Sequence, residues 1–223
     1  MIGEITFYQH PGPNYRNECQ PGQLFLAPMP FMLDSRVPRL RLDYYDKKKP
    51  YNSSYTIEEE DIQSFRPEDV KPIYPLRLSA SEFALCMPHK FRPVIILSQE
   101  MPSWKDYQET YAECYIVVPL YTTKDAVEGY KFSEKFLLKT QAYQYPTLFY
   151  LPEDSQYGIR ESIARFERSM AINRKLLKPI PASLSDDALY CLTEWFYYFL
   201  EAKELNEILK EYREAALKQL RAE

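Results

Sequence analysis

The chain is poor in glycine: it has only 5 in 223 residues, against about 7% in an average protein. Neither a Walker phosphate loop nor a G-x-G-x-x-G turn is present, which excludes sites that wrap a nucleotide phosphate in backbone amides. There are two histidines, His10 and His89, and four scattered cysteines, and none stands at the C-x-x-C or H-x-x-x-H spacing of a metal site. We therefore expect no metal and no other cofactor.

Long hydrophobic runs are also missing. No apolar stretch reaches the roughly 18 residues that a membrane helix needs, so we expect no association with a membrane. The first fifteen residues, MIGEITFYQHPGPNY, lack the basic segment and apolar run of a secretory signal. These features predict a cytoplasmic protein whose cysteines are small buried hydrophobes rather than disulfides.

Charge is distributed in blocks. The formal net charge is −4, and residues 182–223, with five basic and nine acidic side chains, carry all of it. Residues 36–49 and residues 160–178 each have six basic side chains against two acidic ones, whereas residues 58–69 are acidic. Such blocks usually form solvated faces, and a surface that binds a polyanion is the alternative.

Two apolar segments give the strongest signal of secondary structure. Residues 91–98 (FRPVIILS) and 115–123 (YIVVPLYTT) are near-continuous β-branched runs, typical of strands buried on both faces. Further strands are predicted at residues 23–27, ending before Pro28 and Pro30, and at residues 39–44, 132–138, 147–151 and 158–166, with a long polar loop at residues 47–61. Repeated strands of this length with little helix indicate a small barrel or sandwich.

The C-terminal segment changes to a helical pattern. Ser185 followed by Asp186 and Asp187 is typical of a helix start, because a serine caps the first amides and acidic residues suit the helix dipole. Apolar residues then recur every three or four positions. Their stripe shifts phase at residues 202–204, which predicts a kink or a second helix.

Polar residues at the ends of the two apolar runs form the candidate site. Arg92 opens the first run, and Thr122 and Thr123 close the second. If the two strands are antiparallel neighbours, the guanidinium and a hydroxyl meet at one rim of the sheet. This pair suits a phosphodiester, because arginine neutralises developing charge and a hydroxyl donates to a non-bridging oxygen. An arginine before a strand and threonines after one are also ordinary structural features.

Four segments, in this order, resemble the MazF/PemK toxins, the endoribonuclease half of toxin–antitoxin pairs. They are residues 21–26 (PGQLFL), 91–98, 116–123 and 176–189, the last of which contains LSDDAL. The resemblance implies a mainly β fold with a C-terminal helix and an SH3-like, PemK/CcdB-type β-barrel core. It also implies a homodimer that is held by an antitoxin protein and cleaves single-stranded RNA without a metal or cofactor.

The resemblance further implies the residues of the site. Arg92 matches the arginine of the family's Arg-Pro strand. Direct alignment places Tyr121 in the position of the family's catalytic threonine, and Thr122 takes that position if one residue is inserted. We predict that Arg92 and Thr122 are catalytic and that attack by the 2′-hydroxyl leaves a 2′,3′-cyclic phosphate. Auxiliary or RNA-binding roles are predicted for His89, Lys90, Tyr121 and Thr123.

The chain departs from the family in length, which leaves alternatives open. Residues 1–182 are predicted as a barrel domain with an insertion at about 33–88, and residues 183–223 as a helical segment packed on the barrel or on a dimer partner. The insertion either extends an RNA-binding groove or caps the active face and abolishes cleavage. The alternative function is therefore a catalytically inactive PemK-like barrel that binds RNA or protein. A third interpretation is a structural subunit that uses the apolar stripe at residues 195–199 as an interface.

Overall fold

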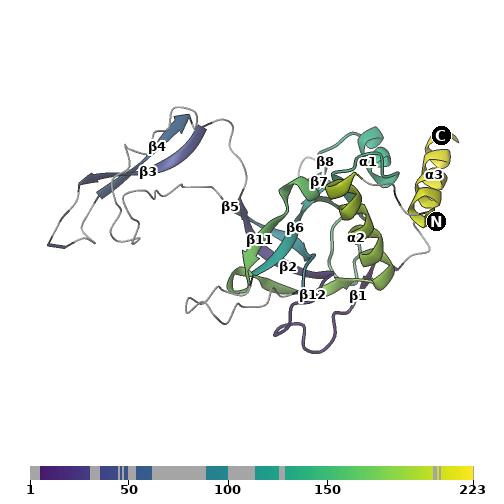
Figure 1. Ribbon diagram of the computed structural model, residues 1–223, viewed down its shortest axis with the longest axis horizontal. Helices are drawn as coiled ribbons and strands as arrows, with labels where there is room; N and C mark the ends of the chain where they lie inside the picture. Colours follow the sequence, from purple (N-terminus) through teal and green to yellow (C-terminus); the bar gives the residue numbers. More distant parts are fainter. Residues whose placement is uncertain are drawn as a thin grey trace. The chain divides into compact units, whose positions relative to one another are not determined.

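The computed structural model of the chain (Figure 1) describes residues 6–30, 36–44, 46, 48–49, 54–61, 89–99, 114–125, 129–202, 205 and 207–222. The chain divides into two compact units. The first consists of Met1–Pro28 and Phe91–Glu223, and the second is Met29–Lys90. Each unit is described by itself below, and the domain boundaries expected from the sequence stay a prediction.

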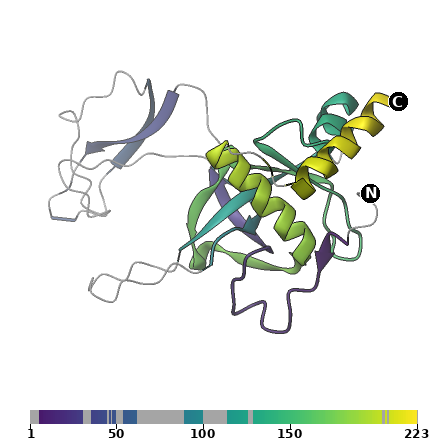
Figure 2. The same ribbon diagram turned by 45° about the vertical axis from the view of Figure 1, so that its right-hand side comes forward.

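The first unit is built on a strongly curled, half-barrel sheet of eight strands (Figures 1 and 2). The strands follow one another in the order β1–β12–β2–β5–β6–β10–β9, and β11 pairs with β6 beside this path. They are β1 (Tyr8–Gln9), β2 (Gln23–Pro30), β5 (His89–Ile96), β6 (Cys114–Thr122), β9 (Leu148–Leu151), β10 (Ser162–Arg165), β11 (Met170–Asn173) and β12 (Lys178–Leu184). The fold is mainly antiparallel β with few helices, which confirms the predicted fold class at this level.

Smaller elements connect the strands of the sheet. β7 (Lys124–Asp125) and β8 (Gly129–Tyr130) pair with each other. Two short 3₁₀ helices, η6 (Phe166–Arg168) and η7 (Arg174–Leu176), lie before and after β11 in the chain.

β5 and β6 lie in the middle of the sheet, and both predicted runs are confirmed as strands. Val94, Ile95 and Ile96 are fully buried at consecutive positions, and Val117 and Val118 are buried in the same way. Side chains of a strand alternate between its two faces. Consecutive burial therefore means that both faces of this part of the sheet are covered.

β2 runs to Pro30, so the prediction that Pro28 ends it is wrong. The described register between β12 and β2 begins at the pair Lys178–Leu26. Pro28 and Pro30 lie beyond that pair, so their missing N–H groups remove no hydrogen bond to β12. Proline is tolerated in a strand at such positions.

The main core lies between one face of the sheet and helix α2 (Asp186–Glu201), which crosses the sheet in Figure 2. Leu192 and Trp195 of α2 belong to the same buried cluster as Ile95, Val118 and Leu120 of the central strands. Burial of a side chain of this kind contributes about 1.5–3 kcal/mol. The stripe of α2 that the sequence offers as an interface is thus used, at Trp195, inside the unit.

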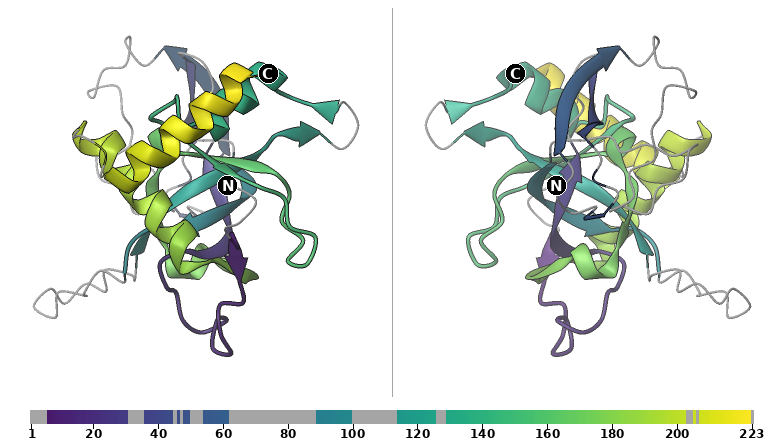
Figure 3. Two further views of the ribbon diagram at one scale, coloured as in Figure 1. Left: turned by 90° about the vertical axis from the view of Figure 1, so that its right-hand side faces the viewer. Right: turned by 90° about the vertical axis from the view of Figure 1, so that its left-hand side faces the viewer.

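The ends of α2 follow the sequence prediction. Ser185 caps the helix, because its side chain accepts a hydrogen bond from the backbone N–H of Ala188. The helix ends at Ala202, which has a φ of 49° in the left-handed region. A second helix, α3 (Glu207–Ala222), follows and contacts α1 (Glu134–Gln141), as Figure 3 shows. The predicted break at residues 202–204 is confirmed at Ala202.

The predicted strand at residues 132–138 is wrong, because helix α1 begins there. The side chain of Ser133 accepts a hydrogen bond from the N–H of Phe136 and caps the helix. The ring of Phe136 also stacks on Phe132 and on Tyr145, with centroids 5.0 and 5.2 Å apart. A local cap and aromatic contacts thus outweigh the strand preference of the aromatic residues.

The second unit contains a two-stranded antiparallel hairpin, β3 (Arg36–Tyr44) and β4 (Ser54–Asp61). The predicted loop at residues 47–61 is therefore wrong from Ser54 onward. The register places Arg36 opposite Asp61 and Arg39 opposite Glu58, and opposite charges at facing positions stabilise antiparallel pairs. A polar run is thus a strand here through its pairing with β3. Residues 62–88 of the predicted insertion lie outside the described residues.

Candidate functional site

The site predicted at the ends of β5 and β6 depends on how the two strands are aligned. Their antiparallel register pairs Val94 with Pro119 and Ile96 with Val117. Continued by two residues, the same register brings Arg92 opposite Tyr121. The guanidinium carbon of Arg92 indeed lies 4.3 Å from the centroid of the Tyr121 ring.

A second arginine reaches the same ring from β10. The register between β6 and β10 pairs Tyr121 with Ile163, and Arg165 is two residues further along, on the same face of the strand. Its guanidinium carbon lies 5.2 Å from the centroid of the Tyr121 ring. Arg92, Tyr121 and Arg165, from three adjacent strands, form what we call the arginine–tyrosine cluster. Each cation–π contact contributes about 0.5–1 kcal/mol at an exposed site and more when it is desolvated.

Arg92 has hydrogen-bonding capacity left in this arrangement. Its Nε atom is buried and has no hydrogen-bond partner among the residues that the structure describes. A buried donor without a partner costs about 1–3 kcal/mol. Arg165 differs, because its guanidinium donates to the carboxylate of Glu167 from Nε at 2.6 Å and also forms an ion pair with it. Arg92 is therefore the member of the cluster better suited to take an anionic ligand.

Thr122 faces the other way. Neighbouring side chains in a strand point to opposite faces of the sheet, so Thr122 lies on the face opposite to Tyr121 and Arg92. Its Oγ1 accepts a hydrogen bond from Nζ of Lys131 at 3.2 Å. The structure therefore brings Arg92 of β5 together with Tyr121 of β6 and separates it from Thr122.

The hydroxyl of Thr123 belongs to a different group of polar side chains. Thr123 is fully buried, and its Oγ1 donates to Oε2 of Glu161 at 2.5 Å. The hydroxyl of Tyr150 donates to the other oxygen of the same carboxylate at 2.6 Å. We call Thr123, Glu161 and Tyr150 the carboxylate network. It ties β9 to the chain after β6 and to the chain before β10, and it holds the Thr123 hydroxyl in a structural hydrogen bond.

The two remaining predicted residues stand at the start of β5. His89 and Lys90 are exposed and fall in the second unit, whereas Arg92 falls in the first. Between them, Phe91 has 69% of its surface exposed. Phe91 and Arg92 are neighbours in the strand, so their side chains lie on opposite faces of the sheet, and the exposed ring of Phe91 is not part of the surface at Arg92.

Sequence reasoning missed Arg165, Glu161 and Tyr150. Arg165 was visible only as one of the six basic residues in the block at 160–178, which the sequence favours as a solvated face. No local pattern singled out Glu161 or Tyr150, because their roles arise from strand pairing.

Among the described residues, no group of three or more His, Cys, Asp or Glu side chains could hold a metal ion. The described helices include none that is both long and apolar enough to cross a membrane.

No protein-family model matches the chain, and no curated protein matches it either. The geometry of the site and the resemblance of the four sequence segments are therefore what bears on function.

Proposed function

We propose that this chain is a MazF/PemK-like endoribonuclease in which the arginine–tyrosine cluster holds a phosphodiester of single-stranded RNA. The observation that carries the proposal is the pair of guanidinium groups on one tyrosine ring, with an Nε of Arg92 that has no described partner. Arginine is the side chain that recognises phosphate by charge and by directed hydrogen bonds.

The proposed reaction needs neither metal nor cofactor. The 2′-oxygen attacks the adjacent phosphorus and the bond to the 5′-oxygen breaks, which leaves a 2′,3′-cyclic phosphate and a 5′-hydroxyl. The 2′-hydroxyl gives up its proton and the leaving 5′-oxygen takes one up, so the step is balanced without water. Arg92 would stabilise the charge that develops on the non-bridging oxygens. Tyr121, rather than Thr122, is the hydroxyl-bearing residue on the same face.

The proposal includes a finer fold and a set of partners. We propose that the curled sheet is an SH3-like, PemK-type barrel and that the chain forms a homodimer. We also propose that the protein is cytoplasmic and that an antitoxin protein binds it. The half-barrel curvature of the sheet supports the first of these points. The others rest on the resemblance of the four sequence segments.

A second candidate function is a barrel that binds RNA or protein without cleaving it. The orientation of Thr122 favours this alternative, because the residue predicted as the second catalytic group lies on the face opposite to Arg92. The ion pair between Arg165 and Glu167 favours it as well, since one of the two cations is already neutralised.

One experiment separates the two candidates. The purified protein is incubated with a long single-stranded RNA in EDTA, beside the variants Arg92→Ala, Tyr121→Phe and Arg160→Ala. Arg160 is an exposed arginine outside the cluster and serves as the matched control for the loss of one positive charge. Filter binding with the same RNA is measured in parallel.

Cleavage to 2′,3′-cyclic phosphate ends that is lost in Arg92→Ala and kept in Arg160→Ala supports the endoribonuclease. Binding without cleavage that weakens in Arg92→Ala supports the binding module. If the folded protein neither binds nor cleaves any of several RNAs, or if Arg160→Ala is as harmful as Arg92→Ala, the cluster is not an RNA site.

A further inference from the structure

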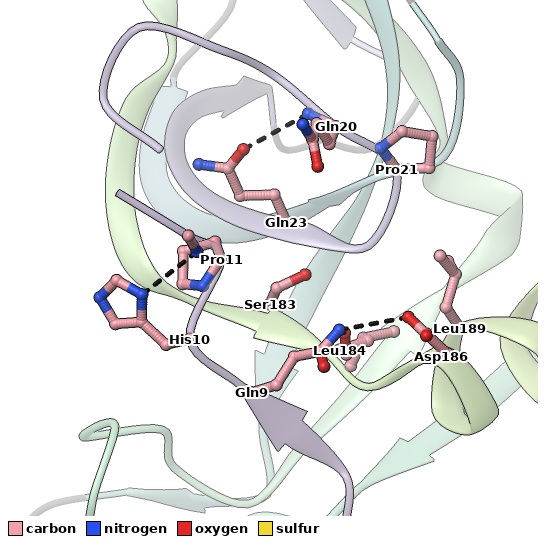
Figure 4. Close-up of a pocket in the computed structure, with 11 residues that line it drawn as sticks. Gln9, His10, Pro11, Gln20, Pro21, Gln23, Ser183, Leu184, Asp186 and Leu189 are labelled. Atoms are coloured by element: carbon pink, nitrogen blue, oxygen red, sulfur yellow. Dashed lines mark hydrogen bonds between the residues drawn. The ribbon is translucent and has the colours of Figure 1, made fainter. Parts of the chain in front are cut away.

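A polar pocket of about 270 Å³ opens in the first unit, away from the arginine–tyrosine cluster (Figure 4). It lies where the ends of β1 and β12, the start of β2 and the first turns of α2 meet. The lining side chains that matter for recognition are Gln9, His10, Gln20, Ser183, Asp186 and Leu189. Small-molecule pockets usually measure about 300–1,000 Å³, so this one suits a single ring system rather than a larger ligand.

The walls of the pocket are held in place by buried hydrogen bonds. Gln23 is 2% exposed; its Oε1 accepts from the backbone N–H of Gln20 at 3.3 Å, and its Nε2 donates to the carbonyl of Tyr15 at 2.7 Å. The adjacent Gly22 has a φ of +85°, and an added Cβ there would lie 3.2 Å from a methyl group of Leu189. The loop between β1 and β2 is thus fixed against β12 and α2, and the pocket is largely preformed.

The polar groups of the pocket have complementary characters. Nε2 of Gln9 donates to the carbonyl of Leu184 at 3.0 Å and to Oδ1 of Asp186 at 3.3 Å, which orients the carboxylate (Figure 4). Nδ1 of His10 accepts from the N–H of Gly12 at 3.1 Å, so a neutral His10 ring carries its proton on Nε2 and can donate there. Figure 4 shows Nε2 of His10 turned away from Asp186, whereas the hydroxyl of Ser183 points into the pocket. The carboxylate of Asp186 therefore accepts hydrogen bonds there, and the hydroxyl of Ser183 can donate one.

Apolar surface completes the pocket. The rings of Pro11 and Pro21 and the side chain of Leu189 belong to its lining. Flat or rounded apolar groups around a few directed polar ones are typical of a site for a small planar ligand. Asp186 and Asp187 occupy the first turn of α2, so a phosphate is disfavoured at this helix end, where the dipole alone would attract one.

We propose that this pocket binds a guanine base. Guanine presents two adjacent donors, N1–H and the N2 amino group, that match one carboxylate, and its O6 and N7 atoms are acceptors. The donors for them are the hydroxyl of Ser183 and the second side-chain N–H of Gln20, whose Nε2 also donates to Glu18 at 3.3 Å. Adenine and cytosine place a ring acceptor beside their amino group, which repels a carboxylate, and uracil offers a single donor. Proteins that bind single-stranded RNA read the edges of extruded bases in this way.

The inference rests on the proposed function only for the source of the guanine. The N–H of Gly22 donates to the carbonyl of Ile96 at 2.8 Å, which joins the edge of the pocket to the end of β5. Arg92 lies four residues before Ile96 on β5, which places it about 13 Å from Ile96 at the usual rise of a strand. A single strand held by its phosphate at Arg92 could therefore place a neighbouring base in the pocket, which would select guanine at that position.

The test uses free nucleosides, which need no RNA binding and no catalysis. Guanosine, adenosine, cytidine and uridine are titrated into the full chain by calorimetry, beside the variants Asp186→Asn and Asp187→Asn. Asp187 is the next residue of the same helix turn, is exposed, and does not line the pocket, so it matches the loss of charge. Thermal unfolding checks that each variant is folded.

We expect guanosine to bind at least tenfold more tightly than the other three nucleosides, and Asp186→Asn to remove this preference while Asp187→Asn keeps it. The proposal is overturned if guanosine shows no binding at about 1 mM, a concentration that would detect a site with a Kd in the millimolar range. Equal binding of all four nucleosides overturns it as well. Guanosine binding that survives in Arg92→Ala while RNA binding is lost separates the two proposals. RNA cleavage without guanosine binding would leave the endoribonuclease intact and refute the pocket.

Discussion

The two candidate binding regions of the first unit lie near opposite ends of β5 and differ in charge. Near Arg92, two guanidinium groups flank one tyrosine ring. Beyond Ile96, the pocket is lined by one carboxylate, that of Asp186, together with side-chain amides and the imidazole of His10. The first region is made by the register of three strands, and the second by loops that a buried glutamine braces. The same sheet thus carries both the proposed site for a charged backbone and the proposed site for a neutral base.

The largest expected effect tests the positive end of this comparison. Replacing Arg92 by alanine removes the cation that would stabilise the transition state, and we expect kcat/KM on a short fluorogenic RNA to fall about 100-fold. Thr122→Ala should change it less than about threefold, because Thr122 faces the other side of the sheet. A loss in Thr122→Ala as large as in Arg92→Ala would show that the catalytic groups lie on the other face.

The next effect concerns the pocket. Gly22→Ala puts a Cβ at a φ of +85° and 3.2 Å from Leu189, and we expect it to lower the free energy of unfolding by about 1–3 kcal/mol. Gly12→Ala is the control, because Gly12 also has a positive φ, +92°, but has no atom within 4 Å of an added Cβ. Urea unfolding of both variants should therefore show the larger loss for Gly22→Ala. Equal losses would mean that the contact with Leu189 does not matter.

Salt should distinguish the two regions directly. Contact with two phosphates of a single strand gives a fall in RNA affinity of about sevenfold between 50 and 200 mM salt. Guanosine is neutral, so its affinity should change less than about twofold over the same range. Calorimetry or fluorescence anisotropy at four salt concentrations measures both slopes. A steep slope for guanosine would place its binding at the arginine–tyrosine cluster instead.

The smallest effect concerns the buried edge of β1, beside the pocket. Burial raises the pKa of the Tyr8 hydroxyl above its ordinary value near 10, and the nearby Asp154 and Tyr150 add to this. The neutral hydroxyl donates to the carbonyl of Pro152 at 2.9 Å, and Tyr8→Phe should cost about 1 kcal/mol at pH 8.

A raised pKa in the folded state means that this contribution is complete below about pH 10 and is lost as the pH rises further. The difference in melting temperature between the wild type and Tyr8→Phe should therefore shrink between about pH 9.5 and 11, because a tyrosine in the unfolded chain ionises in this range. A constant difference for Tyr8→Phe would contradict the role of burial.

The parts of the fold that could be predicted are those with a local cause. Consecutive β-branched residues at 94–96 predict a strand covered on both faces, and Ser185 before two acidic residues predicts the start of α2. The hairpin strand β4 could not be found in this way, because a polar run has no strand signal until its partner is known. Helix α1 was missed because Phe132, Phe136 and the leucines after it fit a strand as well as a helix.

The candidate site was predictable in the same partial manner. Arg92 follows from its place at the head of an apolar run. Whether Tyr121 or Thr122 faces it depends on the alignment of β5 with β6, and a shift of one residue exchanges the two faces. Arg165 and the pocket combine segments that are far apart in the chain, so no spacing in the sequence connects His10 with Asp186.

One consequence of the packing around Trp195 is optical. The indole is 1% exposed and donates from Nε1 to the carbonyl of Leu148. It stacks on Tyr198 at 4.9 Å, and the guanidinium of Arg213 in α3 lies 6.0 Å from its ring. The chain has two tryptophans, so a Trp104→Phe variant leaves Trp195 of α2 as the lone tryptophan, in contact with both β9 and α3. Its emission would report the detachment of α3 separately from the melting of the sheet, without any added label.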